Sequence, residues 1–356
     1  MLVSTVWHFH FLLKGSNGSI EDQANDLPLK LQAGMTLAYV VIFIISLVGN
    51  LMMVYVIFKK PHLRKTTNLL LANMAIADLV ITFFAMPYSV VFLYLRNVWI
   101  SGIFGDVTCK IIQYALALSI SASILTHALV SLDRFFSILF PFKRVTFIKN
   151  PRLSYSFIWC TSCLLMSPYF VVYGVKNVGP DGPSYCVVKE EYFKFLQVFF
   201  ALVFLLLYVV PLVFIGTLYA FICQKLWRNN APGSRSRMAI LKREAQNKKI
   251  VKMLIILVMS FAFCWLPAHI MHLLILFWSD IAVPVVATLL SFWACHSHSA
   301  INPILVTSLN GLYRKACCEI IWNLRKTRRM NNNAPGRKLL INDRFNNSMK
   351  LRESPV

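Results

Sequence analysis

The sequence predicts an all-α membrane protein: a seven-transmembrane helix bundle followed by a short amphipathic eighth helix. Seven long apolar stretches divide the chain, and each can cross a bilayer, which takes about 20 mostly apolar residues. The connectors between them carry Lys and Arg almost entirely on alternate sides. Because basic residues gather on the cytoplasmic side of membrane proteins, we expect the amino end outside the cell, in the plasma membrane.

The expected spans follow one another with mostly short connectors. They cover residues 35–58, 68–93, 108–140, 154–173, 195–223, 250–278 and 281–306. The chain therefore divides into an extracellular amino-terminal segment (1–34), a seven-helix domain (35–308), an amphipathic juxtamembrane helix (309–323) and a cytoplasmic tail (324–356). The tail is polar and Asn-rich, a composition typical of disorder.

The charge of the chain is strongly positive, with 36 basic against 14 acidic residues and a net charge of +22. The basic residues flank the apolar spans instead of clustering on a soluble face, which argues against nucleic-acid binding. Attraction to anionic lipid of the inner leaflet explains them, so membrane lipid is an expected partner.

Cysteines and one sequon mark the two sides of the membrane. Cys109 and Cys186 lie on the outer side, where a disulfide between them can persist and would hold the connector over the bundle mouth. Asn17 begins a glycosylation sequon on the same side, although so short a motif also arises by chance. Cys317 and Cys318 follow the last span and are expected palmitoylation sites.

One acid stands inside the membrane. Asp78 lies near the middle of the second span, where a carboxylate must face the bundle interior. Ser123 in the third span, with Ser299 and Asn302 in the seventh, supplies oxygens that would complete a small hydrated cation site. The alternative is a neutral, protonated Asp78 that bonds to the same groups.

Prolines are expected to bend five of the spans. They are Pro87, Pro168, Pro211, Pro267 and Pro303. Inside a bundle, neighbouring groups or water satisfy the carbonyls that a proline frees. Trp265 stands two residues before Pro267, so this bulky ring lies at a hinge and is either core packing or part of a switch.

The third span ends on the cytoplasmic side with Asp133, Arg134 and Phe135. Arg134 can pair with Asp133 while the bundle is closed, and separation of the two frees a cation to bind something else. The triplet alone is weak, but its position and the following Pro141 and Phe142 make it a strong signal.

These motifs together resemble the rhodopsin-like (class A) G-protein-coupled receptors over about residues 35–322. The matching residues are Gly49-Asn50, the run from Leu71 to Asp78, Asp133-Arg134-Phe135, Trp159, Pro211 with Tyr219, Cys264 to Pro267, and Asn302-Pro303. The resemblance implies a ligand-controlled activator of a heterotrimeric G protein, with arrestin and a receptor kinase as further partners. It also implies that Cys109 and Cys186 form the family disulfide.

The resemblance assigns roles to the polar and hinge residues. Asp78, Ser123, Ser299 and Asn302 would hold a sodium ion, the one expected cofactor and an allosteric one. Trp265 would move under the ligand at the Pro267 hinge, and Pro303 would bend the seventh span. Arg134, released from Asp133, would rearrange with Tyr219 as the sixth helix swings outward, and Phe142 would enter a groove of the G protein.

Two departures from the family pattern concern the switch. Val306 stands where the family usually has a tyrosine, and Asn247 lies near the depth of a frequent acid at the base of the sixth helix. A weak lock on Arg134 follows, so the sequence predicts raised basal signalling.

The outer half of the bundle indicates the class of ligand. The third span carries Leu116, Ala117 and Ile120 where amine receptors need a carboxylate, and the seventh has no Lys for retinal. The expected ligand-binding residues are Tyr88, Gln113, Leu116, Ala117, Ile120, Glu190, Glu191, Trp265, His269, His272, Phe292 and His296. Aromatic faces below an acidic rim suit a basic or amidated peptide.

Three hypotheses for function remain. The first is a neuropeptide receptor resembling the RFamide, neuropeptide Y and tachykinin groups, and the second is a receptor of the same fold for a lipid or other small non-amine ligand. The third is a transporter, but the sequence has no internal repeat. An enzyme is not expected, because no nucleophile and base pair, phosphate loop or Cys/His metal spacing occurs.

Overall fold

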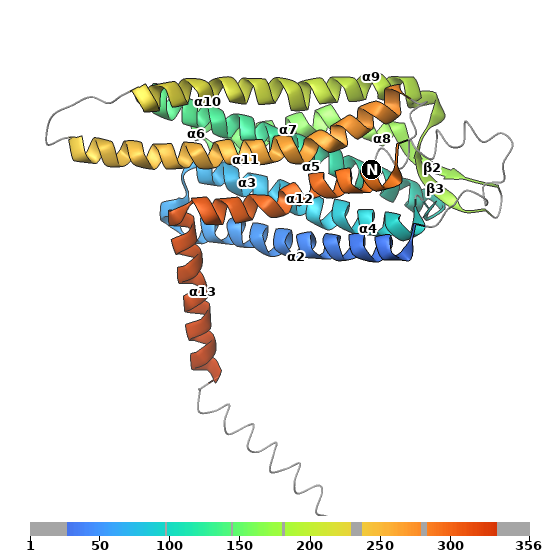
Figure 1. Cartoon of the computed structure of the whole chain (residues 1–356), viewed down its shortest axis with the longest axis horizontal. Helices are drawn as coiled ribbons and strands as arrows, with labels where there is room; N and C mark the ends of the chain where they lie inside the picture. The colour runs from blue at the N-terminus through green and yellow to red at the C-terminus, as the bar shows by residue number, and fades with distance from the viewer. Residues whose placement is uncertain are drawn as a thin grey trace, which may run out of the picture. The chain divides into compact units, whose positions relative to one another are not determined.

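The helices of the bundle lie side by side (Figure 1). The computed structural model describes residues 27–96, 98–143, 145–179, 182–228, 237–278 and 283–332. The helices are α2 (Leu29–Lys59), α3 (Thr66–Val80), α4 (Met86–Leu95), α5 (Gly102–Leu139), α6 (Thr146–Lys149), α7 (Pro151–Met166), α8 (Tyr169–Val172), α9 (Phe193–Phe204), α10 (Val210–Arg228), α11 (Arg237–Phe277), α12 (Val285–Leu309) and α13 (Gly311–Asn332). Short helical turns are η1 (Pro61–Leu63), η2 (Ile81–Ala85), η3 (Glu190–Tyr192) and η4 (Leu205–Val209).

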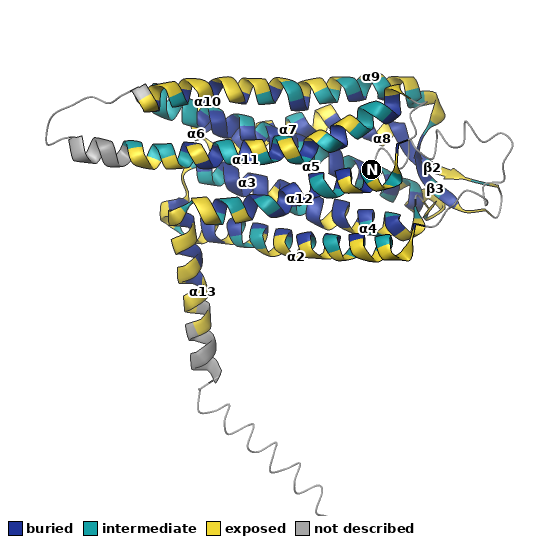
Figure 2. Cartoon of the chain, viewed as in Figure 1, coloured by how far each residue is buried: buried dark blue, intermediate teal, exposed yellow. Residues whose placement is uncertain are grey.

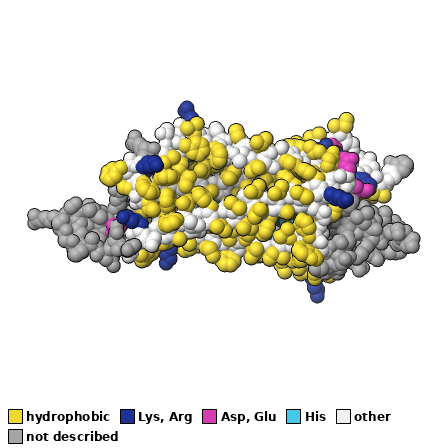
Figure 3. Space-filling view, turned by 90° about the horizontal axis from the view of Figure 1, so that it is seen from above, with side chains coloured by type: hydrophobic (Ala, Val, Ile, Leu, Met, Phe, Trp, Pro, Cys, Tyr) yellow, Lys and Arg dark blue, Asp and Glu magenta, His cyan; other side chains and the backbone are white. Residues whose placement is uncertain are grey.

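The outside of the bundle is apolar. Figure 3 shows hydrophobic side chains over the middle of the visible face, with charged ones near its two ends. Within the described residues, six helices are long and apolar enough to cross a membrane. The seventh, α12, has 25 residues but carries buried polar side chains such as His298, Ser299 and Asn302. A surface this apolar needs lipid around it.

Helix α5 lies at the centre of the bundle, and buried side chains concentrate there (Figure 2). The side chain of Asn73 on α3 contacts both α5 and α7. Its side-chain nitrogen donates to Thr126 Oγ1 at 2.9 Å, and its oxygen accepts from Trp159 Nε1, also at 2.9 Å. One amide therefore connects α3, α5 and α7, and Trp159 of the sequence motif takes part through its indole N–H.

Close contact between α2 and α12 depends on Gly49. A Cβ atom at this position would lie 2.6 Å from Pro303 Cγ, so only glycine fits. The neighbouring Asn50 donates from Nδ2 to the Ser299 carbonyl at 2.9 Å. Proline has no N–H, so Pro303 cannot donate to the Ser299 carbonyl four residues before it. The Asn50 side chain satisfies this carbonyl instead.

The prolines have different effects on the helices. Pro87 and Pro211 each follow a π-helical turn, η2 and η4, in which Met86 N–H donates to Ile81 O and Val210 N–H to Leu205 O. A π-helical turn is wider than an α-helical one, and it leaves room for the proline ring that follows. Pro168 lies at the break between α7 and α8, whereas α11 and α12 continue as helices through their prolines.

A β-hairpin covers the amino-terminal end of α5. Strand β2 (Tyr173–Asn177) pairs antiparallel with β3 (Ser184–Val188), and the short β1 (Val98–Trp99) pairs with the other edge of β3. The disulfide between Cys109 of α5 and Cys186 of β3 is present. This confirms the expected disulfide. Strand β1, which has only two residues, was not predicted from the sequence.

Several boundaries differ from the expected ones. Helix α2 begins at Leu29, directly after Pro28, and not at residue 35. Helix α13, described by itself, ends at Asn332 instead of 323, and its buried residues Tyr313, Ala316, Cys317 and Ile320 recur at helical spacing. Hydrogen-bonded turns continue beyond the apolar residues, so hydropathy marks the membrane crossing and not the helix end.

Candidate functional site

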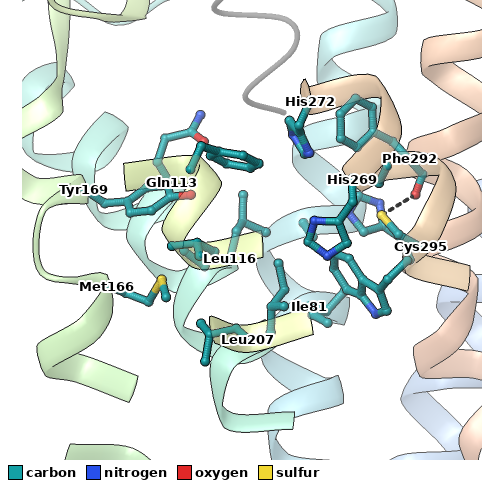
Figure 4. Close-up of a pocket in the computed structure, with 18 residues that line it drawn as sticks. Ile81, Gln113, Leu116, Met166, Tyr169, Leu207, His269, His272, Phe292 and Cys295 are labelled. Carbon is teal, nitrogen blue, oxygen red and sulfur yellow. Dashed lines mark hydrogen bonds between the residues drawn. The ribbon is translucent and has the colours of Figure 1, made fainter. Parts of the chain in front are cut away.

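A cavity lies among the bundle helices, lined by residues of α5, α11 and α12 among others (Figure 4). The space among these side chains that holds no protein atoms is about 730 Å³, part of it open to solvent. The expected residues that line it are Gln113, Leu116, Ala117, Ile120, Trp265, His269, His272, Phe292 and His296. Their spacing of three and four places each group on one face of α5, α11 or α12.

Other lining residues were not expected from the sequence. They are Ile81, Ala85, Met166, Tyr169, Phe200, Val203, Leu207, Ala268 and Cys295. Most are apolar residues in apolar helices, where composition does not distinguish a cavity wall from a lipid-facing surface. Phe200, Val203 and Leu207 are spaced three and four residues apart, and this spacing could have indicated from the sequence that they share one helix face.

The cavity is uncharged but carries unpaired polar atoms. Within the described part of the chain, no Asp, Glu, Lys or Arg lines it. Figure 4 shows His269 and His272 across the cavity from Gln113 and Tyr169. His269 Nδ1, His272 Nε2 and the Trp265 indole nitrogen are buried without a hydrogen-bond partner among the described residues. Buried polar atoms in this state favour a ligand that supplies neutral hydrogen-bonding groups.

Three expected ligand residues lie outside this cavity. Tyr88 lines a smaller adjacent pocket and accepts from Gln113 Nε2 at 3.4 Å, so it supports the wall from behind. Glu190 and Glu191 line a separate hollow beside the hairpin, where Glu190 forms a 2.5 Å ion pair with Lys176. The rim is therefore mixed in charge at this point. Asp280, which directly precedes the seventh expected span and is also expected at the rim, lies outside the described residues.

The intramembrane acid Asp78 is fully buried with the residues expected around it. Asn302 Nδ2 donates to Asp78 Oδ2 at 2.9 Å, and His298 Nδ1 lies 4.0 Å from Asp78 Oδ1. Ser123 Oγ and Asn302 Oδ1 are buried without partners in the described region, and Ser299 is buried beside them. Unpaired oxygens around a carboxylate fit a hard cation such as sodium.

The carboxyl-terminal end of α5 carries an ion pair on a buried carboxylate. Arg134 Nη2 donates to Asp133 Oδ2 at 2.6 Å, as the sequence predicts. Thr67 Oγ1 donates to the same oxygen at 2.6 Å, and Lys149 Nζ lies 2.7 Å from Asp133 Oδ1. The contact between Lys149 and Asp133 was not expected from the sequence. It forms only because the connector after α5 folds back and brings α6 against that helix.

The other expected coupling residues differ in exposure. Phe142, in the connector after α5, is fully exposed. Tyr219 is buried, and its hydroxyl has no hydrogen-bond partner within the residues described. Pro267 and Pro303 lie inside α11 and α12. A fully exposed Phe is available to a partner, and an unpaired buried hydroxyl is available to a rearranged Arg134.

The cysteines expected to be modified are unequally accessible. Cys318 is exposed, whereas Cys317 is buried and its burial raises the pKa of the thiol. Cys318 is therefore the more accessible of the two. Asn17 lies outside the described residues.

Comparison with known proteins agrees with this arrangement. A family model described as 7 transmembrane receptor (rhodopsin family) matches residues 49–305. The chain is 32% identical to the Allatostatin-A receptor of Bombyx mori over 288 residues, which cover 78% of this chain and 77% of that protein. It is 30% identical to the Growth hormone secretagogue receptor type 1 of Rattus norvegicus over 321 residues, covering 86% and 85% of the two chains.

Proposed function

Because this chain belongs to the rhodopsin family of seven-transmembrane receptors, we propose that it binds an extracellular neuropeptide and activates a heterotrimeric G protein. It is a multi-pass membrane protein and, like its family, not an enzyme. The observation that carries the peptide proposal is the His-rich cavity with no charge among its described lining residues, together with a separate hollow of mixed charge beside the hairpin. Its relatives include receptors for allatostatin-A and for growth hormone secretagogues, which supports the same ligand class.

The cavity favours a peptide with a neutral end. A carboxamide offers both N–H donors and a carbonyl acceptor, which match the unpaired nitrogens of His269 and His272. A free carboxylate would enter a site without a cation among its described lining residues, and burial of an unpaired charge is costly. Basic side chains farther along the peptide would meet Glu191 at the rim.

A panel of amidated neuropeptides, each beside its free-acid form, tests this proposal in cells by second-messenger response. The amide of an active peptide is expected to act at lower concentration than the acid. His272→Ala should weaken the response tenfold or more, the size of effect that a buried contact contributes. Tyr114→Phe is the matched control, since its hydroxyl donates to the Cys163 carbonyl away from the cavity. Equal potency of amide and acid would contradict the proposal.

The second candidate is a lipid or other small non-amine ligand of the same receptor. The apolar wall of the cavity, with Leu116, Ile120 and Leu207, favours it. A screen of lipids and small neutral molecules in the same cells separates the two: activation by one of these, with none by any peptide, would replace the first proposal.

We expect raised basal signalling from the cytoplasmic end. Within the described residues, the ion pairs of Arg134 are with Asp133 of its own helix, and Asn247 on α11 brings no charge to hold the helices together. Nucleotide exchange on a G protein without added ligand measures this. Exchange at the level of empty membranes would count against a weak lock.

Asp78, Ser123, Ser299 and Asn302 are proposed to hold sodium as an allosteric modulator. Sodium at constant ionic strength, compared with a bulky organic cation, should raise the melting temperature of the purified chain. Asp78→Asn should abolish this rise, because the amide keeps the shape and removes the charge. A rise that survives in Asp78→Asn would place the ion elsewhere.

The topology and modifications complete the proposal. The receptor lies in the plasma membrane with its amino end outside the cell, so Asn17 can carry a glycan. On the cytoplasmic side, the exposed Cys318 takes a palmitoyl chain more readily than the buried Cys317. Arrestin, a receptor kinase and inner-leaflet lipid are the further cytoplasmic partners. An epitope before Asn17 detected on intact cells supports this topology, and detection only after permeabilisation refutes it.

A further inference from the structure

Two cations share the buried carboxylate of Asp133. Its side chain is 0% exposed, and its two oxygens have different partners. Arg134 and Thr67 both donate to Oδ2, each at 2.6 Å, while Lys149 Nζ donates to Oδ1 at 2.7 Å. The two cations therefore do not compete for one oxygen, and either can leave without displacing the other.

Lys149 is held in position by more than the acid. Its ammonium also donates to Ser137 Oγ at 3.1 Å, one turn beyond Asp133 on α5. It ends α6, the one-turn helix whose Ile148 is buried, so the connector is anchored where Lys149 reaches α5. The Lys149 side chain remains 40% exposed, so water also contacts it.

We propose that Lys149 is a second counter-ion that keeps Asp133 paired when Arg134 leaves, and thereby lowers the free energy needed to release Arg134. This inference rests on the proposed function, in which Arg134 must leave Asp133. Loss of one partner from a buried ion pair is costly mainly because the other charge stays buried and uncompensated. With Lys149 on the second oxygen, Asp133 keeps a cation and the Thr67 hydrogen bond in both states. Repulsion between the Arg134 and Lys149 cations also favours the release of Arg134.

A double-mutant cycle tests the shared carboxylate without any ligand or G protein. The purified full-length chain in lipid nanodiscs would be compared as unmodified protein, Arg134→Ala, Lys149→Met and the double variant, by melting temperature. The double variant is expected to lose more than the sum of the single losses, because only there is Asp133 left without a cation. Additive losses would overturn the inference.

Asp133→Asn is the second background for the cycle. A neutral amide needs no counter-ion, so the excess loss should disappear there. If the double variant does not fold, recovery of its yield on adding Asp133→Asn reports the same coupling, and failure to recover overturns the inference.

The functional consequence is read from ligand-independent nucleotide exchange on heterotrimeric G proteins of each α-subunit class. Lys149→Met should lower this exchange about two- to fivefold, the range for partly exposed ion pairs. Lys149→Arg should restore it, and Arg152→Met, which removes an exposed charge three residues away, should leave it unchanged. Higher exchange in Lys149→Met would mean that Lys149 locks the inactive state, contrary to the proposal. Absence of any ligand-independent exchange by the unmodified chain would instead refute the raised basal signalling, while the cycle still decides on the ion pairs.

Discussion

Substitution of Gly49 by Ala should separate α2 from α12. The new Cβ would lie 2.6 Å from Pro303 Cγ and 2.7 Å from Pro303 Cβ. Carbon atoms prefer about 3.5–4.0 Å, so one helix must move by roughly 1 Å. The proline ring is rigid and cannot turn away. Overpacking of this kind costs about 1–3 kcal/mol.

The shift would also strain the adjacent hydrogen bond. Asn50 Nδ2 lies 2.9 Å from the Ser299 carbonyl, and a displacement of about 1 Å would take it beyond hydrogen-bonding range. Gly216→Ala on α10 is the matched control, because a Cβ there meets no atom within 4 Å. Alanine improves helix propensity by about 1 kcal/mol at either site, so the difference between the variants isolates the clash.

Thermal unfolding in lipid nanodiscs measures this difference. Gly216→Ala should melt at or above the temperature of the unmodified chain, and Gly49→Ala several degrees below Gly216→Ala. If the two variants melt at the same temperature, α2 and α12 do not meet as closely as the Gly49 contact requires, and the argument is wrong.

Three further predictions concern separate parts of the molecule. Replacement of both Cys109 and Cys186 by Ser should cost about 2–4 kcal/mol and lower the melting temperature as much as reduction of the unmodified protein does. Trp159→Phe should cost about 1–2 kcal/mol in unfolding free energy, because Asn73 Oδ1 loses its indole donor in the interior; an unchanged melting curve would exclude this. Phe142→Ala, at a fully exposed side chain, should leave the melting temperature unchanged but lower nucleotide exchange about tenfold, as an aromatic anchor does.

The sequence predicted the bundle because each crossing must satisfy its backbone hydrogen bonds within a helix. The family of the receptor followed from residues whose spacing is fixed by contact, such as Asn73 with Trp159 and Gly49 with Pro303. Helix ends were less predictable, since α2 begins at Leu29, before the first expected span, where Pro28 stops the turn from extending back.

The cavity was predictable where polar residues break an apolar helix. Gln113, His269 and His272 stand out in their spans and do line it. Met166 and Tyr169 do not stand out, because the rotation of α7 and α8 against α5 depends on packing that hydropathy does not encode. The Lys149 contact with Asp133 is similar: two charges far apart in sequence meet only through the folded connector.

The polar stripe of α12 has a consequence for biogenesis. His296, His298 and Asn302 are buried against other helices, but a nascent α12 would expose them to lipid. Polar side chains oppose independent insertion by the translocon. The seventh segment should therefore integrate poorly when fused alone to a reporter, and efficiently once the preceding helices are present to receive it. Assembly order, and not hydrophobicity alone, would then complete the topology.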